Sequence, residues 1–291
     1  MRTISSFFRR HPRLSLASVL TAPVAWLLIV YIGSLAFMIV SALFQLDEQS
    51  QEPTTELTAE NLRIAFTRSE FLQVVLKSVG VAVAVTLLCF ALALPMAFYI
   101  AKVAKPWARR ALIVAVLLPL WAGYLVKGYA WKAMLRPASE FGINTDGGFL
   151  TSVFGWTPGF GWTAVILSLS YLWLPYMVLP IYAGLDRLPP SLLDASGDLG
   201  ARPLRTFRSV VMPMLVPSIA AGSLFTFSLS LGDFIIPNIV TEGKVRLVGK
   251  FIESTLNAPN QPLAAAITLW PLLIIVVYLV GLKRLGAFES L

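Results

Sequence analysis

The chain alternates long apolar runs with short polar connections. Six runs are long enough to cross the hydrocarbon core of a bilayer, which takes about 20 apolar residues in a helix. They are Leu16–Leu43, Leu72–Ala101, Ala111–Met134, Gly161–Leu185, Val211–Ile236 and Leu263–Leu282. The first run is too long for the core of a cleavable signal peptide, so it is expected to stay as the first helix. The pattern predicts an all-α integral membrane protein, with residues 1–291 forming one transmembrane domain.

The charges between the runs predict an orientation, because loops rich in Lys and Arg are retained in the cytoplasm. With six helices, one side of the membrane receives Arg2, Arg9, Arg10, Arg13, Lys102, Lys105, Arg109, Arg110, Arg187, Arg202, Arg205, Arg208, Lys283 and Arg284. The other side begins with an acidic loop over residues 47–70. Both termini are therefore expected in the cytoplasm, although the outer side also carries Lys127, Lys132, Arg136, Lys244, Arg246 and Lys250.

Composition excludes several classes of protein. Hydrophobic residues make up 57% of the chain and charged residues 13%, whereas soluble domains carry roughly 25% charged residues. The single Cys89 and the single His11 exclude a disulfide framework and a Cys or His metal cluster. No G-x-x-x-x-G-K-[ST] phosphate loop is present, so the chain cannot hydrolyse ATP. We expect neither an enzyme nor a bound cofactor, and the scattered basic residues do not form a nucleic-acid patch.

The connection over residues 186–210 predicts a short helix at the cytoplasmic surface. Ser191 and Asp194 have the spacing of a capping box, and Gly200 is a plausible left-handed end. Between these ends lies an apolar patch of Leu192, Leu193, Ala195 and Leu199. Such a patch is typical either of a docking site for a partner or of a helix lying in the lipid headgroups.

The same connection resembles the EAA loop of ATP-binding-cassette (ABC) importer permeases. That pattern is E-A-A, three residues, G, nine residues, I, one residue, L-P. The chain has Asp194-Ala195-Ser196, then Gly200, Val210 and Met212-Pro213, at the same spacing. The resemblance implies a type I importer permease in which Asp194, Ala195, Ser196, Gly200 and Pro213 serve the contact with the ATPase.

Further segments are similar to the spermidine/putrescine permeases of the binding-protein-dependent type. They are LLPLWAGYLVKGYAWKAML, YMVLPIYAGLDRL and LGDFIIPNIV. The resemblance implies an inner-membrane subunit of a bacterium that imports polyamines, or alternatively another small amine or amino-acid-like solute. It also implies an ATPase dimer that binds ATP and Mg²⁺, a second and non-identical permease, and an external solute-binding protein.

One face of the fifth run carries small and polar residues, at spacings of four, four, four and three. These residues are Ser218, Gly222, Thr226, Ser230 and Asp233. The stripe suits either a water-lined pathway or close helix packing through small side chains. Asp233 is costly in lipid, so it is expected to face the pathway and accept a cationic substrate, or to pair with Lys127.

Aromatic residues gather near the outer side, with Trp121 and Tyr124 as candidates for contact with an ammonium group. An aromatic belt at the membrane interface is the other interpretation. A secondary transporter would be expected to show repeated broken helices, and a membrane enzyme would need a cluster of reactive side chains. The sequence shows neither feature.

Overall fold

The computed structural model describes residues 12–47, 53–137, 147–258, 260–284 and 286. The basic residues Arg2, Arg9 and Arg10, together with His11, lie outside this part of the chain. Two units are present, one of residues 1–67 with 255–269 and one of residues 68–254 with 270–291. Each unit is described by itself.

The first unit consists of an apolar helix followed by a small hairpin. Helix α2 (Pro12–Ser41) is followed by strands β1 (Phe44–Leu46) and β2 (Pro53–Leu57), which pair antiparallel, and by α3 (Glu60–Thr67). The Asn61 amide donates hydrogen bonds to the carbonyls of Ala42 (3.2 Å) and Phe44 (2.8 Å) and so fixes the turn after α2. On α3, hydrogen bonding to Glu60 and its charge raise the pKa of the Arg63 guanidinium.

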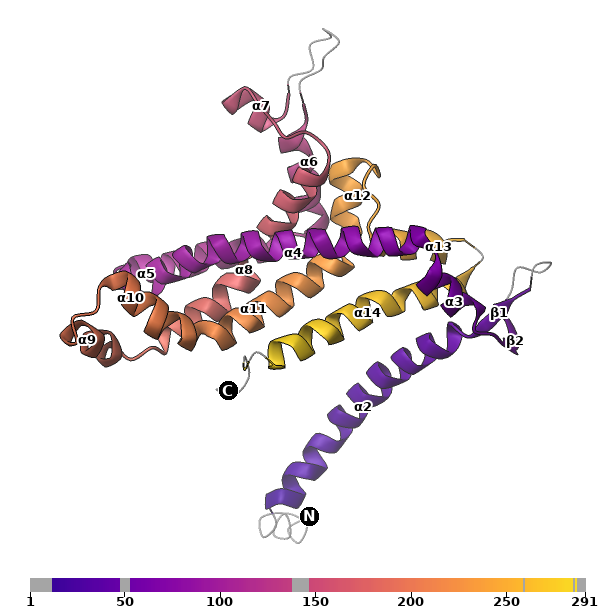
Figure 1. Ribbon diagram of the computed structural model, residues 1–291, viewed down its shortest axis with the longest axis horizontal. Helices are drawn as coiled ribbons and strands as arrows, with labels where there is room; N and C mark the ends of the chain where they lie inside the picture. The colour runs from indigo at the N-terminus through magenta and orange to yellow at the C-terminus, as the bar shows by residue number, and fades with distance from the viewer. Residues whose placement is uncertain (1–11, 48–52, 138–146, 259, 285, 287–291) are drawn as a thin grey trace, which may run out of the picture. The chain divides into compact units, whose positions relative to one another are not determined.

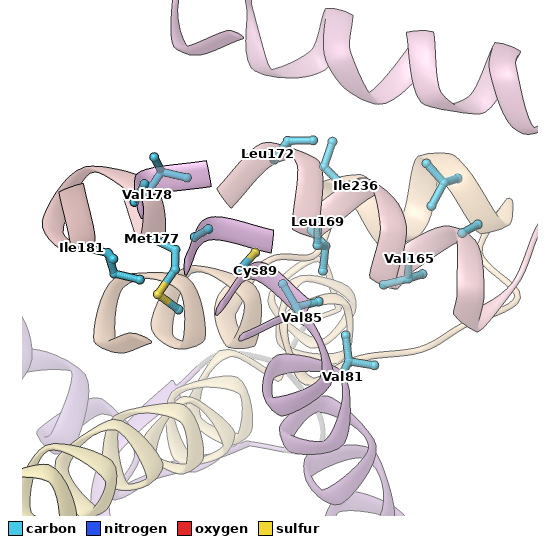
Figure 2. Packing of buried hydrophobic residues seen from close by; sticks show 14 of the residues in the cluster. Val81, Val85, Cys89, Val165, Leu169, Leu172, Met177, Val178, Ile181 and Ile236 are labelled. Carbon is cyan, nitrogen blue, oxygen red and sulfur yellow. The ribbon is translucent and has the colours of Figure 1, made fainter. Parts of the chain in front are cut away.

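Three long helices form the core of the second unit. They are α4 (Ser69–Phe98), α8 (Trp162–Asp186) and α11 (Met212–Gly232), which pack against one another side by side (Figure 1). Buried aliphatic side chains fill the space between α4 and α8, with Val85 and Cys89 facing Leu169 (Figure 2). The predicted runs Leu72–Ala101 and Gly161–Leu185 therefore correspond to helices with nearly the expected bounds.

Short helical turns extend two of these helices at the end that carries the basic connections. A π-helical turn η1 (Tyr99–Val103) continues α4, while α10 (Pro203–Thr206) and the π-helical turn η2 (Phe207–Val211) lead into α11. A π-helical turn is a wide turn that recurs at functional sites. Helix α9 (Pro190–Asp198) lies beyond this end of the bundle, at the left of Figure 1.

The expectation of one continuous helix over Ala111–Met134 is wrong. The structure has α5 (Pro106–Trp121) and α6 (Tyr124–Leu135), which meet at an angle of 96°. Ala122 and Gly123 between them have extended backbone with ψ near 140°, and Pro119 supplies no backbone N–H for the last turn of α5. Hydropathy could not show the turn because the residues around it stay apolar.

The fifth run also ends earlier than predicted. Helix α11 ends at Gly232 instead of continuing to Ile236, and a separate helix α12 (Ile235–Thr241) begins just beyond Asp233. The remaining helices are α7 (Phe149–Phe154), α13 (Val248–Leu256) and α14 (Gln261–Arg284). Among the described residues, five helices are long and apolar enough to cross a membrane, or six when α5 and α6 count as one bent span. The fold is that of an all-α membrane protein.

Candidate functional site

Asp233 lies in the break between α11 and α12 and connects three elements. Its Oδ1 accepts hydrogen bonds from the backbone N–H groups of Ile235 (3.0 Å) and Ile236 (3.2 Å). Its Oδ2 accepts a hydrogen bond from the Tyr124 hydroxyl at the start of α6. The first two bonds cap α12 in the way an Asp caps a helix N-terminus. The residue is only 7% exposed, so the carboxyl group is buried and bonded to three donors.

A cleft of about 330 Å³ opens beside this carboxylate. Its wall is formed by Tyr124, Trp173, Ser228, Leu229, Gly232, Asp233, Phe234 and Ile235. The rings of Tyr124 and Trp173 stack with centroids 6.1 Å apart. The Trp173 indole N–H is buried and has no hydrogen-bond partner among the described residues. A carboxylate next to two aromatic faces is a combination that attracts an organic cation.

The ion pair with Lys127 that the sequence allowed is not formed. No contact within ion-pair distance joins Lys127 to Asp233 in the described part of the chain, and Tyr124, three residues earlier on α6, approaches the carboxylate instead. Two of the basic residues assigned to the outer side have acidic partners elsewhere. Lys132 pairs with Glu242 at 3.1 Å, and Lys250 pairs with Glu253 at 2.7 Å.

The small and polar residues of α11 lie in the packing between helices. The Thr226 hydroxyl donates to the carbonyl of Gly222 (3.0 Å) and the Ser230 hydroxyl to that of Thr226 (2.7 Å), so both are satisfied within α11. Both residues are buried, at 0% and 1% exposure. At Gly222 the helix approaches α8 so closely that a Cβ would lie 2.8 Å from the Met177 sulfur. This geometry favours the packing interpretation of the stripe.

The cleft therefore brings together two of the five candidate pathway residues, Asp233 and Tyr124. Thr226 and Ser230 lie within the helix packing, and Trp121 at the end of α5 is 93% exposed, outside the cleft. Trp173 also lines the cleft; it is one of the aromatic residues near the outer side of the sequence pattern, but the sequence did not single it out. No local pattern could have selected it, because its importance comes from a stacking contact with a ring 49 positions earlier in the chain.

The predicted helix of the cytoplasmic connection is present as α9, although its first turn differs from the expectation. Pro189 precedes the helix and no side chain caps its N-terminus, so the capping box of Ser191 and Asp194 is wrong. A proline at the first helical position has no N–H to satisfy and fixes a helical φ without a capping side chain. Asp194 is exposed on the helix surface.

Helix α9 is followed by a left-handed glycine, Gly200, as the sequence predicts. Gly200 has φ +73°, its N–H donates to the Gly197 carbonyl (2.8 Å), and the Ala201 N–H donates to the Ser196 carbonyl (3.1 Å). This pair of bonds is the Schellman motif, which places a left-handed residue just after the helix. The Ser196 hydroxyl also lies 2.8 Å from that of Thr206 and so joins α9 to α10.

An apolar surface on α9 and the residue that follows it is left uncovered by the described part of the chain. Leu199 is 87% exposed and Leu192 is 40% exposed, Ala195 is exposed, and Leu193 packs partly against the core. Pro213 lies in the first turn of α11. Among the described residues, no group of three or more His, Cys, Asp or Glu side chains is placed to hold a metal ion.

Comparisons with known proteins agree on one class of protein. The family model described as "Binding-protein-dependent transport system inner membrane component" matches residues 87–285. The chain is 42% identical to the inner membrane ABC transporter permease protein YdcU of Escherichia coli, over 99% of this chain and 95% of that protein. It is 33% identical to the spermidine/putrescine permease PotB of Haemophilus influenzae, over 76% of this chain and 79% of that protein.

A solved structure shares the fold at low identity. It is a bacterial ABC transporter involved in the import of alginate, which superposes with a TM-score of 0.73 at 15% identity and covers 97% of this chain and 98% of its own. This likeness shows that the helical fold is shared with an ABC transporter. The chain belongs to the family of inner-membrane permease components of binding-protein-dependent ABC importers, and it is the multi-pass membrane subunit rather than the ATPase.

Proposed function

We propose that this importer permease carries a polyamine such as spermidine or putrescine and that the cation passes the cleft at Asp233. The observation that carries the proposal is the buried carboxylate beside the stacked rings of Tyr124 and Trp173. A carboxylate has about four acceptor positions, and three of those of Asp233 are used within the chain. One position stays available for an ammonium N–H that reaches the cleft.

The relatives support this class of substrate without deciding it. Spermidine/putrescine permeases of several bacteria are 31–33% identical to this chain. The molybdenum transport permease of Mycobacterium bovis is also 32% identical, over 55% of this chain. Identity at this level therefore does not separate substrates, and the choice of a cation rests on the chemistry of the cleft.

The coupling part of the proposal concerns α9. We assign Asp194, Ala195, Ser196 and Gly200 to the surface that docks on a dimer of ATPase subunits, which bind the ATP and Mg²⁺. The exposed Leu199 and Leu192 supply apolar area for that contact, and the Schellman end gives the chain a compact turn at Gly200. Pro213, in the first turn of α11, is assigned to the same coupling region. The complex also takes a second, non-identical permease and an external binding protein.

Uptake of labelled spermidine tests the choice of substrate. The complete complex, with binding protein, is reconstituted in proteoliposomes with Asp233→Asn and, as a matched control, Tyr124→Phe. Asn keeps an oxygen for the backbone of α12 but removes the negative charge, whereas Phe removes one hydrogen bond and keeps the charge. A hydrogen bond to a charged group contributes roughly 1.5–3 kcal/mol. Asp233→Asn is therefore expected to raise the spermidine concentration that gives half-maximal uptake by roughly 10- to 100-fold.

Tyr124→Phe is expected to change the spermidine concentration at half-maximal uptake far less. Equal effects of the two substitutions would contradict a charge-based role for Asp233. ATP-dependent uptake of an amino-acid-like solute instead of polyamines would replace the substrate and leave the permease class unchanged.

A further inference from the structure

The segment that leads into α9 is held by side chains from α5 and η1. Arg109 of α5 donates from Nε to the Tyr182 hydroxyl (2.8 Å) and from Nη2 to the Asp186 carboxylate at the end of α8. Its guanidinium also lies 5.2 Å from the centre of the Tyr182 ring. Lys102 of η1 donates from Nζ to the Leu188 carbonyl (3.1 Å), two residues beyond Asp186. The first turn after α8 is therefore tied to the connection between α4 and α5.

The segment that leaves α9 is tied to the same region. Phe207, the first residue of η2, packs edge-to-face on Phe98, the last residue of α4, with ring centroids 6.2 Å apart. Ser196 and Thr206 join α9 itself to α10. Both ends of the α9 connection thus meet the cytoplasmic end of α4 and its continuation, while the surface of α9 stays exposed.

The ion pair of Arg109 with Asp186 contributes little to folding, which suggests another role for it. The side chains of Arg109 and Asp186 are 31% and 47% exposed, and ion pairs at such positions add little to stability. They do restrict position, because a guanidinium that binds two partners fixes the direction of both. A push on α9 therefore reaches α4 and α5 through these contacts as well as through the chain itself.

Helix α5 leads from this contact to the cleft. It is a helix of 16 residues, which corresponds to a length of about 24 Å. Arg109 lies in its first turn, and its last residue is followed by the turn at Ala122 and Gly123 and then by Tyr124, which binds Asp233. A displacement of the first turn of α5 would therefore move the residue that holds the carboxylate of the cleft.

We propose that Arg109, Tyr182, Asp186 and Lys102 form a latch that passes the movement of α9 to α5 and so to the cleft. The inference rests on the proposed docking of α9 to the ATPase. The four residues are positioning residues, since they touch neither the substrate nor ATP. Their loss is expected to separate ATP hydrolysis from transport while leaving assembly intact.

The test measures ATP hydrolysis and spermidine uptake in the same proteoliposomes, with the complete complex and its binding protein. The variants are Arg109→Gln, Asp186→Asn and Tyr182→Phe, the last of which keeps the ring and removes only the hydroxyl. Arg110→Gln is the matched control, because the neighbouring Arg110 is exposed and, among the described residues, donates only to the Pro106 carbonyl of its own helix. The charge swap Arg109→Asp with Asp186→Arg tests whether the pair itself matters.

The latch predicts that the ATP consumed for each spermidine imported rises at least threefold in Arg109→Gln and Asp186→Asn. The ratio is expected to stay unchanged in Arg110→Gln and to return toward the wild-type value in the charge swap. A parallel fall of hydrolysis and uptake, or an unchanged ratio, overturns the proposal. If the Arg109 variants do not assemble, the ATP consumed for each spermidine imported is measured in Tyr182→Phe instead, and an unchanged ratio there overturns the proposal.

Gly200→Arg in the same assay separates this inference from the proposed function. If Gly200→Arg abolishes uptake while the latch variants behave as wild type, the latch alone is wrong. If Gly200→Arg has no effect on uptake, the docking of α9 is wrong, and the latch is wrong with it.

Discussion

Asp233 carries out two tasks with one carboxylate. Its Oδ1 caps α12, and its Oδ2 accepts a hydrogen bond from the Tyr124 hydroxyl. The residue also lines the cleft. Helix α12 has seven residues, and its first turn is held by the two hydrogen bonds to Oδ1 together with the burial of Ile236. The same oxygen atoms supply the negative charge assigned to substrate binding. Substitutions at this position can separate the two tasks.

Asp233→Ala removes both the cap and the charge, while Asp233→Asn removes only the charge. Loss of a capping side chain costs about 0.5–2 kcal/mol, so Asp233→Ala is expected to destabilise the purified permease and Asp233→Asn to change its stability much less. Thermal unfolding in detergent measures the difference. An equal loss of stability in both variants would show that the charge, rather than the cap, holds α12 in place.

Gly200 and Gly197 form a matched pair on one short helix. Gly200 has φ +73°, whereas Gly197 is helical and has open space where a Cβ would stand. Alanine in the left-handed region costs roughly 1–2 kcal/mol, but inside a helix it gains up to about 1 kcal/mol over glycine. Gly200→Ala is expected to speed hydrogen exchange at the end of α9, and Gly197→Ala to slow it. Equal exchange rates in the two variants would mean that the end of α9 is not held by the Schellman motif.

Contacts between helices decide how the stripe on α11 is used. Gly222 lies against Met177 of α8, and the hydroxyls of Thr226 and Ser230 are bonded within α11. Spacing predicts that these residues share a face of α11, and Gly222, Thr226 and Ser230 are buried. Whether that face met water or another helix depends on α8, and nothing within the α11 sequence records that neighbour.

Gly222→Ala tests the close approach of α11 and α8. The added Cβ would lie 2.8 Å from the Met177 sulfur and 3.2 Å from its Cα, and overpacking of this kind costs about 1–3 kcal/mol. The variant is expected to unfold at a lower temperature than the wild type. Gly281→Ala is the control, since a Cβ there meets nothing within 4 Å. Unchanged stability of Gly222→Ala would contradict the packing interpretation.

The two broken helices mark the limit of what hydropathy predicts. The length of each apolar run is enough to predict a membrane helix, and the helices over residues 69–103, 162–186 and 261–284 follow the predicted runs. The turns at Ala122–Gly123 and at Asp233 interrupt runs that stay apolar on both sides. The contact that joins the two turns, Tyr124 with Asp233, spans 109 residues and has no local signal.

The second unit combines the cleft at Asp233 with the exposed helix α9. In the second unit, the contacts of Lys102 with Leu188 and of Arg109 with Asp186 place the connection between α4 and α5 and the connection between α8 and α11 at one end of the bundle. Six spans predict that arrangement, because successive spans cross the membrane in opposite directions and every second connection therefore lies on the same side. The break that holds Asp233 lies at the opposite end of α11. A permease that couples ATP hydrolysis to import needs these two sites to respond to each other.

The most direct test of this coupling is spermidine uptake driven by ATP in proteoliposomes that contain the complete complex, with wild-type permease compared with Gly200→Arg. Arginine is unfavourable at φ +73° and adds a long side chain at the end of α9. We predict ATP-dependent uptake by the wild type, abolished by Gly200→Arg and retained by Gly197→Ala. Uptake that requires no ATP, or that Gly200→Arg leaves unchanged, would contradict the account.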